Sequence, residues 1–455
     1  MRKLISMLVA ASLLFGLGLP VAFAQEQEVL EFYHGYYHEE SEWPAAKVMR
    51  DLYDAFAAMH ADGPVRFKPI AVENRDEIIS AQVAGGSFPD MVDAGATLPQ
   101  AAIVQGLVLD LKPFIDENDL QGAVGLNYTQ NMADGCIYTV HDQIETRGMW
   151  YNSRLLADAG VKSEEITDWT SFGEAMEKVR ALNSDAYGYA AGQGSFMMIT
   201  AVLAASEEGR RLIESPFAQE TIEADAFAVA FKTVAALDQA NGSAHTTPDV
   251  GNLMDDFNKT GIAAFLSNGV WNASGIDPAL EDVIEPTLFP GNVAISTAGS
   301  GLTVSSRMSE AKTALALEFL RYMTSEEVQT RIFLGVQANP CNTAVDLAAL
   351  AAESGDAITL KLANACAMAN GAGIIVRDAA NVWGDDVANA INADPSAFDS
   401  DVIDTMQQMS DLLNQYQQML SGDDEYTQED LDKMTEWFGQ VQDWVDQVKA
   451  DLNIE

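Results

Sequence analysis

The stretch from Ser80 to Gly95, SAQVAGGSFPDMVDAG, limits the possible folds of this chain more than any other. Apolar residues at helical spacing lead into Gly85-Gly86, which predicts that a helix ends there, because glycine readily adopts the left-handed conformation of a helix C-terminus. Pro89 prevents the helix from resuming, and Met91-Val92 indicates a short buried strand. A helix followed in this way by a strand is half of a parallel α/β unit, and ligands bind beyond the carboxyl ends of such strands. Asp93 is therefore the first candidate for the wall of a binding site.

Strands and helices also alternate in the part of the chain before this stretch. Strands are predicted over residues 29–33 and 65–72, and helices begin at Trp43-Pro44 and at Asp76. Strand, helix, strand, helix, strand is the order of a doubly wound α/β lobe.

Two capping boxes predict the starts of later helices. Ser171 with Glu174 is one, and Thr427 with Asp430 is the other. Apolar residues at threes and fours over residues 431–448 predict a last helix with one apolar face. We expect this face to pack on its own protein rather than on a partner.

The N-terminus has the pattern of a secretory signal peptide. Arg2 and Lys3 precede a mostly apolar run, and Ala22-Phe23-Ala24 predicts cleavage before Gln25. The alternative, a permanent membrane anchor, is less favoured because the run is short and interrupted by glycine and proline. No cysteine lies near the cleavage site, so we expect a periplasmic protein without a lipid anchor.

Charge and length narrow the class further. The chain has 68 acidic and 25 basic residues, a formal net charge of -43, which disfavours nucleic acid and anionic membranes as partners. Without the 24 residues of the predicted signal peptide the chain has 431 of its 455 residues, too many for a single core, which predicts two lobes. The three cysteines leave two possibilities open: Cys341 pairs with Cys366 and leaves Cys136 free, or all three stay reduced.

Catalytic motifs are not evident in the sequence. His34 and His38 have helical i, i+4 spacing, but Gly35 between them favours a loop and no second cluster supplies further metal ligands. The sequence contains no P-loop, no G-x-S-x-G and no G-x-G-x-x-G after a strand. We therefore expect a protein that is not an enzyme and has neither a metal nor a cofactor.

Aromatic residues gather near predicted strand ends. They are Tyr33, Tyr36, Tyr37 and Trp43 in and after the first strand, and Trp150, Trp271 and Trp383 further along. Flat rings stack on the apolar faces of sugar rings, so this placement favours a carbohydrate cleft, although core packing is the alternative for any single tryptophan.

Six motifs follow one another along the chain. They are Val29–Tyr33 with the polar loop after it, residues 84–90 (AGGSFPD), Trp150-Tyr151-Asn152, Phe257-Asn258 with Gly269-Val270-Trp271, Ala298–Ser305, and residues 316–329. Together they resemble the extracellular solute-binding proteins of family 1, the sugar-binding components of ABC importers that are similar to maltose-binding protein.

The resemblance implies two α/β lobes of the type II periplasmic binding protein fold, joined by crossing segments with the ligand cleft between them. Residues 25–144 and 298–338 would form the first lobe, 145–297 and 339–421 the second, and 422–455 a C-terminal helical extension. The protein is then a monomer that binds a mono- or oligosaccharide and delivers it to the permease subunits of an ABC importer.

The resemblance also implies ligand contacts from both lobes, and Asp90 is expected to be structural. With Asp93 included, the candidate ligand-binding residues are Tyr36, Tyr37, His38, Asn74, Arg75, Asp93, Glu145, Trp271, Gly301, Arg377 and Trp383. Ala94 stands where maltose-binding protein has a tryptophan, which indicates a different sugar.

Three alternatives stay open from the sequence. Arg75, Arg147 and Arg377 would form a phosphate clamp if they converged, which would make the ligand a glycerol phosphate or another anionic polyol. A secreted carbohydrate-active enzyme and a surface receptor without a permease are the other two.

Overall fold

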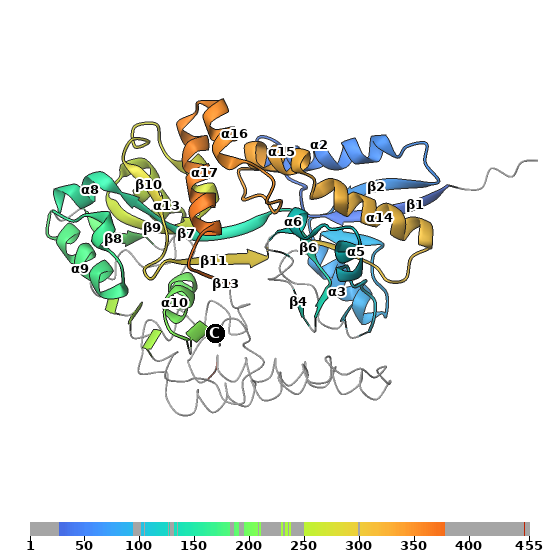
Figure 1. The fold of residues 1–455 in the computed structure, drawn as a ribbon, viewed down its shortest axis with the longest axis horizontal. Helices are drawn as coiled ribbons and strands as arrows, with labels where there is room; N and C mark the ends of the chain where they lie inside the picture. The colour runs from blue at the N-terminus through green and yellow to red at the C-terminus, as the bar shows by residue number, and fades with distance from the viewer. Residues whose placement is uncertain are drawn as a thin grey trace, which may run out of the picture.

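The computed structural model describes residues 27–93, 102–103, 105–125, 127, 132–133, 135–182, 186–190, 195–207, 209–210, 229–230, 233–234, 236–237, 250–298, 301–377 and 450. The predicted signal peptide, Ala94, Trp383 and the predicted extension, apart from residue 450, lie outside this part of the chain. Within it, no helix is long and apolar enough to cross a membrane. Two separate sheets, each with its own helices, lie side by side (Figure 1).

The first sheet has the strand order β2-β1-β3-β12-β6. Its strands are β1 (Glu28–His34), β2 (Val65–Ala71), β3 (Met91–Asp93), β6 (Val140–His141) and β12 (Gly301–Val304). The helices of this lobe are α2 (Pro44–Met59), α3 (Arg75–Ala84), α5 (Lys112–Glu117), α6 (Gln121–Val124), α14 (Glu310–Met323) and α15 (Glu326–Val336), and β4 (Met132–Ala133) pairs with β5 (Cys136–Ile137).

Pairing in this sheet is parallel only where the chain alternates strand and helix. β1 runs parallel to β2 and β3, whereas β12 is antiparallel to both β3 and β6. The predicted α/β lobe is confirmed, with a mixed edge because β12 enters the sheet from the late part of the chain.

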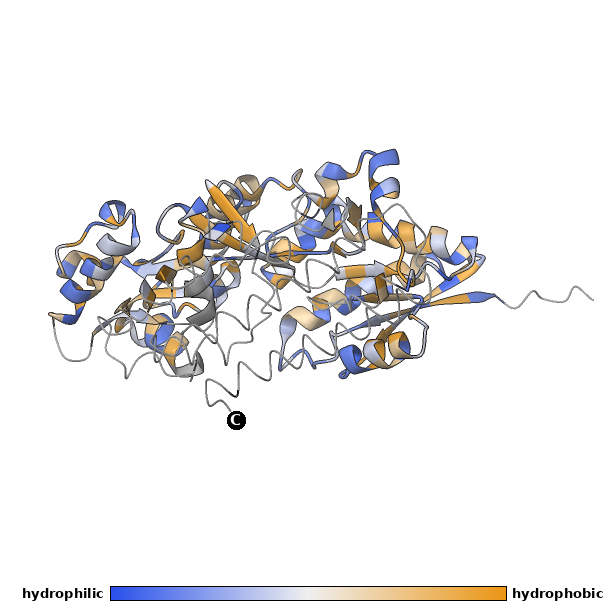
Figure 2. Ribbon diagram, turned by 90° about the horizontal axis from the view of Figure 1, so that it is seen from below, coloured by the Kyte–Doolittle hydropathy of each residue, from blue (hydrophilic) through white to orange (hydrophobic). Residues whose placement is uncertain are grey.

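Alternating side chains of the first sheet fill two cores. Phe32 of β1 belongs to the larger core beneath α2, α14 and α15, while Tyr33 packs against the smaller core beneath α3. The larger core is held by aromatic contacts, with Phe319 4.5 Å from Phe67 and 4.9 Å from Phe56 between ring centroids. Figure 2 shows the apolar residues concentrated on the interior strands and on the inward sides of the helices.

The Ser80–Gly95 stretch folds largely as the sequence predicts. Helix α3 ends at Ala84, and of the two glycines it is Gly86, with φ of 73°, that adopts the left-handed conformation. All three residues of β3 are buried. The Asp90 carboxylate accepts a hydrogen bond from the Glu31 N–H at 3.1 Å and pairs with Lys312 at 2.7 Å, so its structural role is confirmed.

The second sheet has the order β13-β11-β7-β9-β8, with β10 also paired to β7. Its strands are β7 (Ile144–Asn152), β8 (Tyr187–Ala190), β9 (Ala263–Gly269), β10 (Ile284–Thr287), β11 (Val293–Ala298) and β13 (Ile374–Arg377). Its helices are α8 (Ser153–Asp158), α9 (Trp169–Arg180), α10 (Ser195–Leu203), α13 (Val250–Asp255), α16 (Leu347–Ser354) and α17 (Ala357–Asn370), with short helical turns η1 (Ser163–Glu165), η3 (Asp256–Thr260) and η4 (Val270–Gly275).

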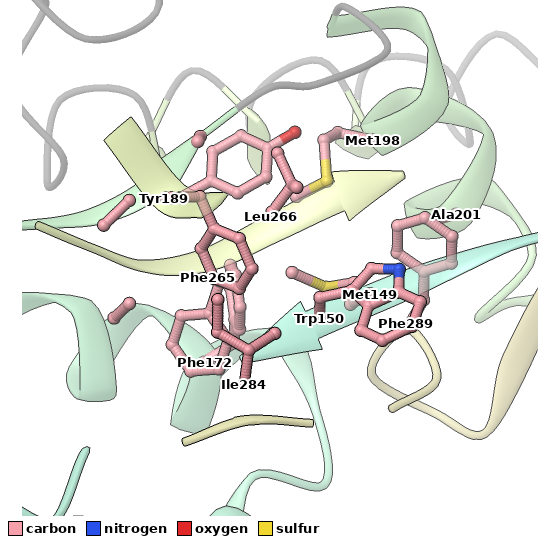
Figure 3. Packing of buried hydrophobic residues seen from close by; sticks show 14 of the residues in the cluster. Met149, Trp150, Phe172, Tyr189, Met198, Ala201, Phe265, Leu266, Ile284 and Phe289 are labelled. Atoms are coloured by element: carbon pink, nitrogen blue, oxygen red, sulfur yellow. The ribbon is translucent and has the colours of Figure 1, made fainter. Parts of the chain in front are cut away.

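The core of the second lobe surrounds β7 and β9. Figure 3 shows Trp150, Phe172 and Phe265 within it. Trp150 lies two residues before the end of β7, near a strand end as predicted, but its ring is 1% exposed and packs in this core. For Trp150 the structure therefore has the core-packing alternative.

One predicted helix cap is wrong. The N-cap of α9 is Asp168, whose carboxylate accepts from the Ser171 N–H at 2.8 Å, while the Ser171 hydroxyl accepts from the Asp168 N–H at 3.1 Å. Ser171 therefore completes a capping box that begins three residues earlier, and Glu174 is not part of it. The predicted box at Thr427 lies outside the described residues.

Within the described residues, the chain passes between the sheets at three places. They are β6 to β7, β11 to β12, and the segment after α15. Asn339 in that last segment accepts from the Ile144 N–H at 2.8 Å through its carbonyl oxygen, and its side-chain amide donates to the Thr146 hydroxyl at 3.0 Å. The first and third crossing segments are thus hydrogen-bonded to each other.

None of the three cysteines forms a disulfide. Of the two possibilities that the sequence left open, the structure has the reduced one. Burial raises the pKa of the Cys341 thiol well above its usual value and also raises that of Cys366, so both stay protonated.

Gly125 supplies a test of how tightly α6 packs on the third crossing segment. Its φ is 52°, and a Cβ there would lie 2.0 Å from the Cys341 carbonyl oxygen. Gly125→Ala therefore adds a backbone clash to the strain of a positive φ, and we expect it to lower the free energy of unfolding by about 3 kcal/mol or more in urea titrations. Gly160→Ala is the matched control: its φ is 67° with no atom within 4 Å, so it should cost only about 1 kcal/mol. Equal losses for the two variants would contradict this packing.

Candidate ligand-binding site

A cavity of about 310 Å³ opens where β1, β3 and α3 meet. The loop after β1 and the start of α3 form its walls, in agreement with the rule that ligands bind beyond the carboxyl ends of parallel strands. The residues that line it are Gly35, Tyr36, Tyr37, Trp43, Glu73, Asn74, Arg75, Asp76, Glu77 and Asp93.

One wall of the cavity is aromatic. Tyr37 and Trp43 are 39% and 41% exposed, which is high for such large apolar rings. His38 stacks on Tyr37 with 4.2 Å between ring centroids, and Trp43 lies 5.3 Å from Tyr36. Trp43 is the extended N-cap residue of α2, and Pro44 follows it at the first helical position, so its backbone is well defined.

Hydrogen bonds from Arg50 and Gln143 fix the loop that carries these rings. The Arg50 guanidinium donates to the carbonyl oxygens of Tyr36 at 2.8 Å and His38 at 2.6 Å. The Tyr36 ring itself is buried, and its hydroxyl accepts from the Gln143 amide at 3.0 Å. The aromatic wall is thus preformed.

A buried charge pair forms the floor. The Asp93 side chain is 1% exposed and pairs with the Arg75 guanidinium at 3.2 Å. Its other oxygen accepts from the Gly301 N–H at 2.9 Å, which connects β3 to the start of β12. Arg75 also bonds to Asp76 at 3.0 Å, so its charge is balanced by protein carboxylates.

His34, at the end of β1, is buried beneath the loop. Its Nδ1 accepts from the Tyr36 N–H at 3.3 Å. Burial, together with the positive charges of Arg50 and Arg75, lowers the pKa of His34 to about 4. The imidazole is therefore neutral at physiological pH.

A second group of candidates lies on the other sheet. Arg147 of β7 pairs with Glu145 at 3.1 Å, and its guanidinium carbon lies over the Trp271 ring, 5.4 Å from the centroid. Trp271 is half-buried in η4, immediately after β9.

The predicted site residues thus fall into three sets. Tyr36, Tyr37, Asn74, Arg75 and Asp93 line the cavity, with His38 stacked on its rim and Gly301 hydrogen-bonded to its floor. Glu145 and Trp271 form the group on the second sheet. Arg377 ends β13, where its backbone pairs with Ser296, and Trp383 lies outside the described residues.

Five residues that line the cavity are not among the predicted site residues, namely Gly35, Trp43, Glu73, Asp76 and Glu77. The sequence could have indicated Trp43, because an aromatic residue before a proline at the start of a helix is fixed beside the loop that precedes the helix. Nothing in the sequence distinguishes the three acidic residues, because acidic residues occur throughout the chain.

The proposed phosphate clamp does not form among the described residues. Arg75 begins helix α3 beside the first sheet, Arg147 lies in β7 of the second sheet, and each is paired with a carboxylate. No group of three His, Cys, Asp or Glu side chains that would suit a metal ion is found in the described part of the chain.

Two sheets with the chain crossing between them, and a polar-aromatic cavity at a strand edge, define the class of two-lobe solute-binding proteins. Residues 51–359 match the bacterial extracellular solute-binding protein family, and the chain belongs to that family. The family expected from the sequence motifs is confirmed.

Known structures show the same fold. A Streptococcus pneumoniae solute-binding protein, solved in complex with the blood group A-trisaccharide, is 39% identical over 93% of this chain and 100% of its own, with a TM-score of 0.68. A chitin oligosaccharide binding protein is 21% identical over 86% of this chain and 98% of its own, with a TM-score of 0.62.

Among curated proteins, the arabinooligosaccharide-binding protein of Bacillus subtilis (strain 168) is 27% identical over 123 residues. That match spans 25% of this chain and 26% of the Bacillus subtilis protein, so the chain aligns with about a quarter of its length.

The neutral state of His34 makes folding stability depend on pH. In the unfolded chain this histidine takes up a proton below about pH 6.5, whereas in the folded protein it resists until about pH 4. The contribution of neutral His34 to the free energy of unfolding is therefore fully present above pH 6.5. As the pH falls towards 4, this free energy drops by about 3 kcal/mol.

We expect the difference in unfolding free energy between wild type and His34→Gln to shrink by that amount from pH 7 to pH 4, measured by urea unfolding. His60→Gln, which removes a side chain near Glu318 away from the cavity, is the control. A wild type–His34→Gln difference that stays constant over this range would contradict the assignment.

Proposed function

We propose that this protein binds a neutral mono- or oligosaccharide between its lobes and delivers it to the permease of an ABC importer. The observation that carries the proposal is the cavity, in which exposed aromatic rings stand beside hydrogen-bonding groups. The trisaccharide-bound structure of a relative that is 39% identical supports it.

The chemistry of the cavity suits a sugar. Tyr37 and Trp43 offer flat apolar faces for the C–H groups of a pyranose ring, and Asn74 and the neighbouring carboxylates offer partners for its hydroxyls. Trp271 would provide a second stacking surface from the other lobe. A ligand that contacts both lobes favours the closed form.

The same cavity disfavours anions. Its arginine, Arg75, is already paired with Asp93 and Asp76, and Glu73 and Glu77 add further negative charge at the walls. A phosphate ligand would have to displace one of these carboxylates and enter against a net charge of -43. A glycerol phosphate is therefore not favoured.

We further propose the finer details of this role. The chain would be cleaved before Gln25 and act in the periplasm as a monomer without a lipid anchor, with residues 25–144 and 298–338 as one lobe and 145–297 and 339–421 as the other. The hydrogen bond from the Ile144 N–H to the Asn339 carbonyl oxygen supports a boundary there. The protein would release its ligand unchanged, without cofactor or catalysis.

The proposed ligand-binding residues come from both lobes. They are Tyr36, Tyr37, His38, Asn74, Arg75, Asp93 and Gly301 in or around the cavity, and Glu145, Trp271, Arg377 and Trp383 beyond it. Of these, Asp93 and Gly301 would act by holding Arg75 and β12 in place.

A thermal-shift panel tests the proposal. It compares the blood group A-trisaccharide, chitin oligosaccharides and arabino-oligosaccharides with glycerol 3-phosphate and sugar phosphates. A ligand at one hundred times its Kd stabilises the folded state by about 2.7 kcal/mol, so a neutral saccharide should raise the Tm by a few degrees. Stabilisation by phosphates alone would contradict the proposal, and release of shorter sugars would reveal an enzyme.

Trp43 gives a sharper prediction. Trp43→Ala removes a stacking surface and should weaken saccharide binding by about tenfold, equivalent to about 1.4 kcal/mol, in calorimetric titrations. Trp43→Phe keeps a ring and should lose less. Met59→Ala, at a 61% exposed site at the far end of α2, is the control and should bind as wild type. Equal affinity of wild type and Trp43→Ala would remove Trp43 from the site.

A further inference from the structure

The indole of Trp271 occupies the space that a side chain at residue 269 would need. A Cβ on Gly269 would lie 2.2 to 2.4 Å from three atoms of the six-membered indole ring. Gly269 has φ of -73° and ψ of 173°, an extended conformation open to any residue. Glycine is therefore required here by the close approach of the ring and not by the backbone angles.

Buried side chains fix the backbone just before this ring. The Trp150 indole N–H donates to the Gly269 carbonyl oxygen at 3.1 Å, and the Asn268 side-chain oxygen accepts from the Gly269 N–H at 2.8 Å. The backbone N–H and carbonyl oxygen of Gly269 are thus both hydrogen-bonded to side chains.

Buried side-chain amides hold the residue after the ring. The Asn272 side-chain oxygen accepts from the amides of Asn268 at 2.9 Å and Asn258 at 2.8 Å. Asn258, Asn268 and Asn272 are all buried, so the turn that carries Trp271 is anchored on both sides.

Arg147, on the neighbouring strand β7, contacts the Trp271 ring. In the β7–β9 ladder Arg147 lies directly opposite Gly269, so its long side chain extends on the face where the indole replaces a glycine side chain. Its guanidinium carbon lies 5.4 Å from the centroid of the Trp271 ring, and Glu145 holds the guanidinium at 3.1 Å. The Arg147 side chain is 12% exposed, which strengthens a cation–π contact.

We infer that Arg147 is a positioning residue for Trp271, and that Gly269 and the Glu145–Arg147 pair together set the orientation of this indole before ligand arrives. This inference deepens the proposed function and rests on it for the role of Trp271 in sugar binding. A ring that is already oriented loses little conformational freedom on binding, which raises affinity. Because Glu145 balances its charge, Arg147 orients the stacking surface without making the site selective for anions.

The first test observes the ring without ligand. In a ¹H–¹⁵N spectrum the Trp271 indole N–H peak is assigned by its loss in Trp271→Phe. Arg147→Met should shift or broaden this peak, whereas Arg147→Lys, which keeps a cation, should change it less. Arg154→Met, at an exposed position on α8, is the matched control and should leave the peak in place. An unchanged peak in Arg147→Met overturns the positioning role.

The second test measures binding by calorimetry with the saccharide that gives the largest thermal shift. Arg147→Met should weaken binding by about three- to tenfold, with partial recovery in Arg147→Lys. In a Trp271→Ala background Arg147→Met should have no further effect, because the ring that it orients is gone. A shifted indole peak with unchanged affinity, or equal losses in both backgrounds, overturns the contribution of Arg147 to binding.

Gly269 supplies an independent variant. Gly269→Ala should displace the indole and weaken binding in the wild type, yet be tolerated in Trp271→Ala, where the space is empty. If the wild-type protein binds none of the saccharides in the panel, the proposed function fails, while the indole peak still decides whether Arg147 positions Trp271.

Discussion

The structure depends on how three crossing segments satisfy their backbone hydrogen bonds as they leave one sheet for the other. Gln329, fully buried in α15, donates to the carbonyl oxygens of Asp142 at 2.6 Å and Met323 at 2.7 Å, and accepts from the Cys341 N–H at 2.7 Å. It thus connects the first crossing segment to the third. Burial and the nearby Asp93 raise the pKa of the Asp142 carboxyl well above its usual value, so the crossing holds a group that favours its neutral form. Removing a buried partner here would leave polar groups unsatisfied.

In the candidate site, too, the charged and polar groups are paired within the protein before any ligand binds. Arg75 is neutralised by Asp93, Arg147 by Glu145, and the loop that carries Tyr37 and Trp43 is held by Arg50. What is left exposed is mainly aromatic surface and hydrogen-bonding groups. Such a surface is suited to neutral, hydroxyl-rich ligands, and preorganisation reduces the ordering required on binding.

The sequence predicted those parts of the fold that depend on local patterns. The glycine stop and buried strand of residues 80–95 could be derived because helix termination and strand burial are short-range effects. The contact between Asp93 and Gly301 could not, because 208 positions separate them and nothing local indicates the pairing. The position of Trp150 near a strand end was predictable, but the burial of its ring was not, because periodicity does not show which strand is central. The capping-box pattern points to Ser171 because it pairs a serine with a glutamate three residues later, whereas the box in the structure pairs Asp168 with Ser171.

The central claim is that a neutral saccharide binds between the two lobes and favours their closure. Small-angle X-ray scattering on the free protein and on the protein saturated with its best saccharide tests this claim most directly. The account predicts a smaller radius of gyration in the saturated protein, because a ligand that contacts both lobes stabilises the closed form. Saturable binding with no change in the radius of gyration would contradict it.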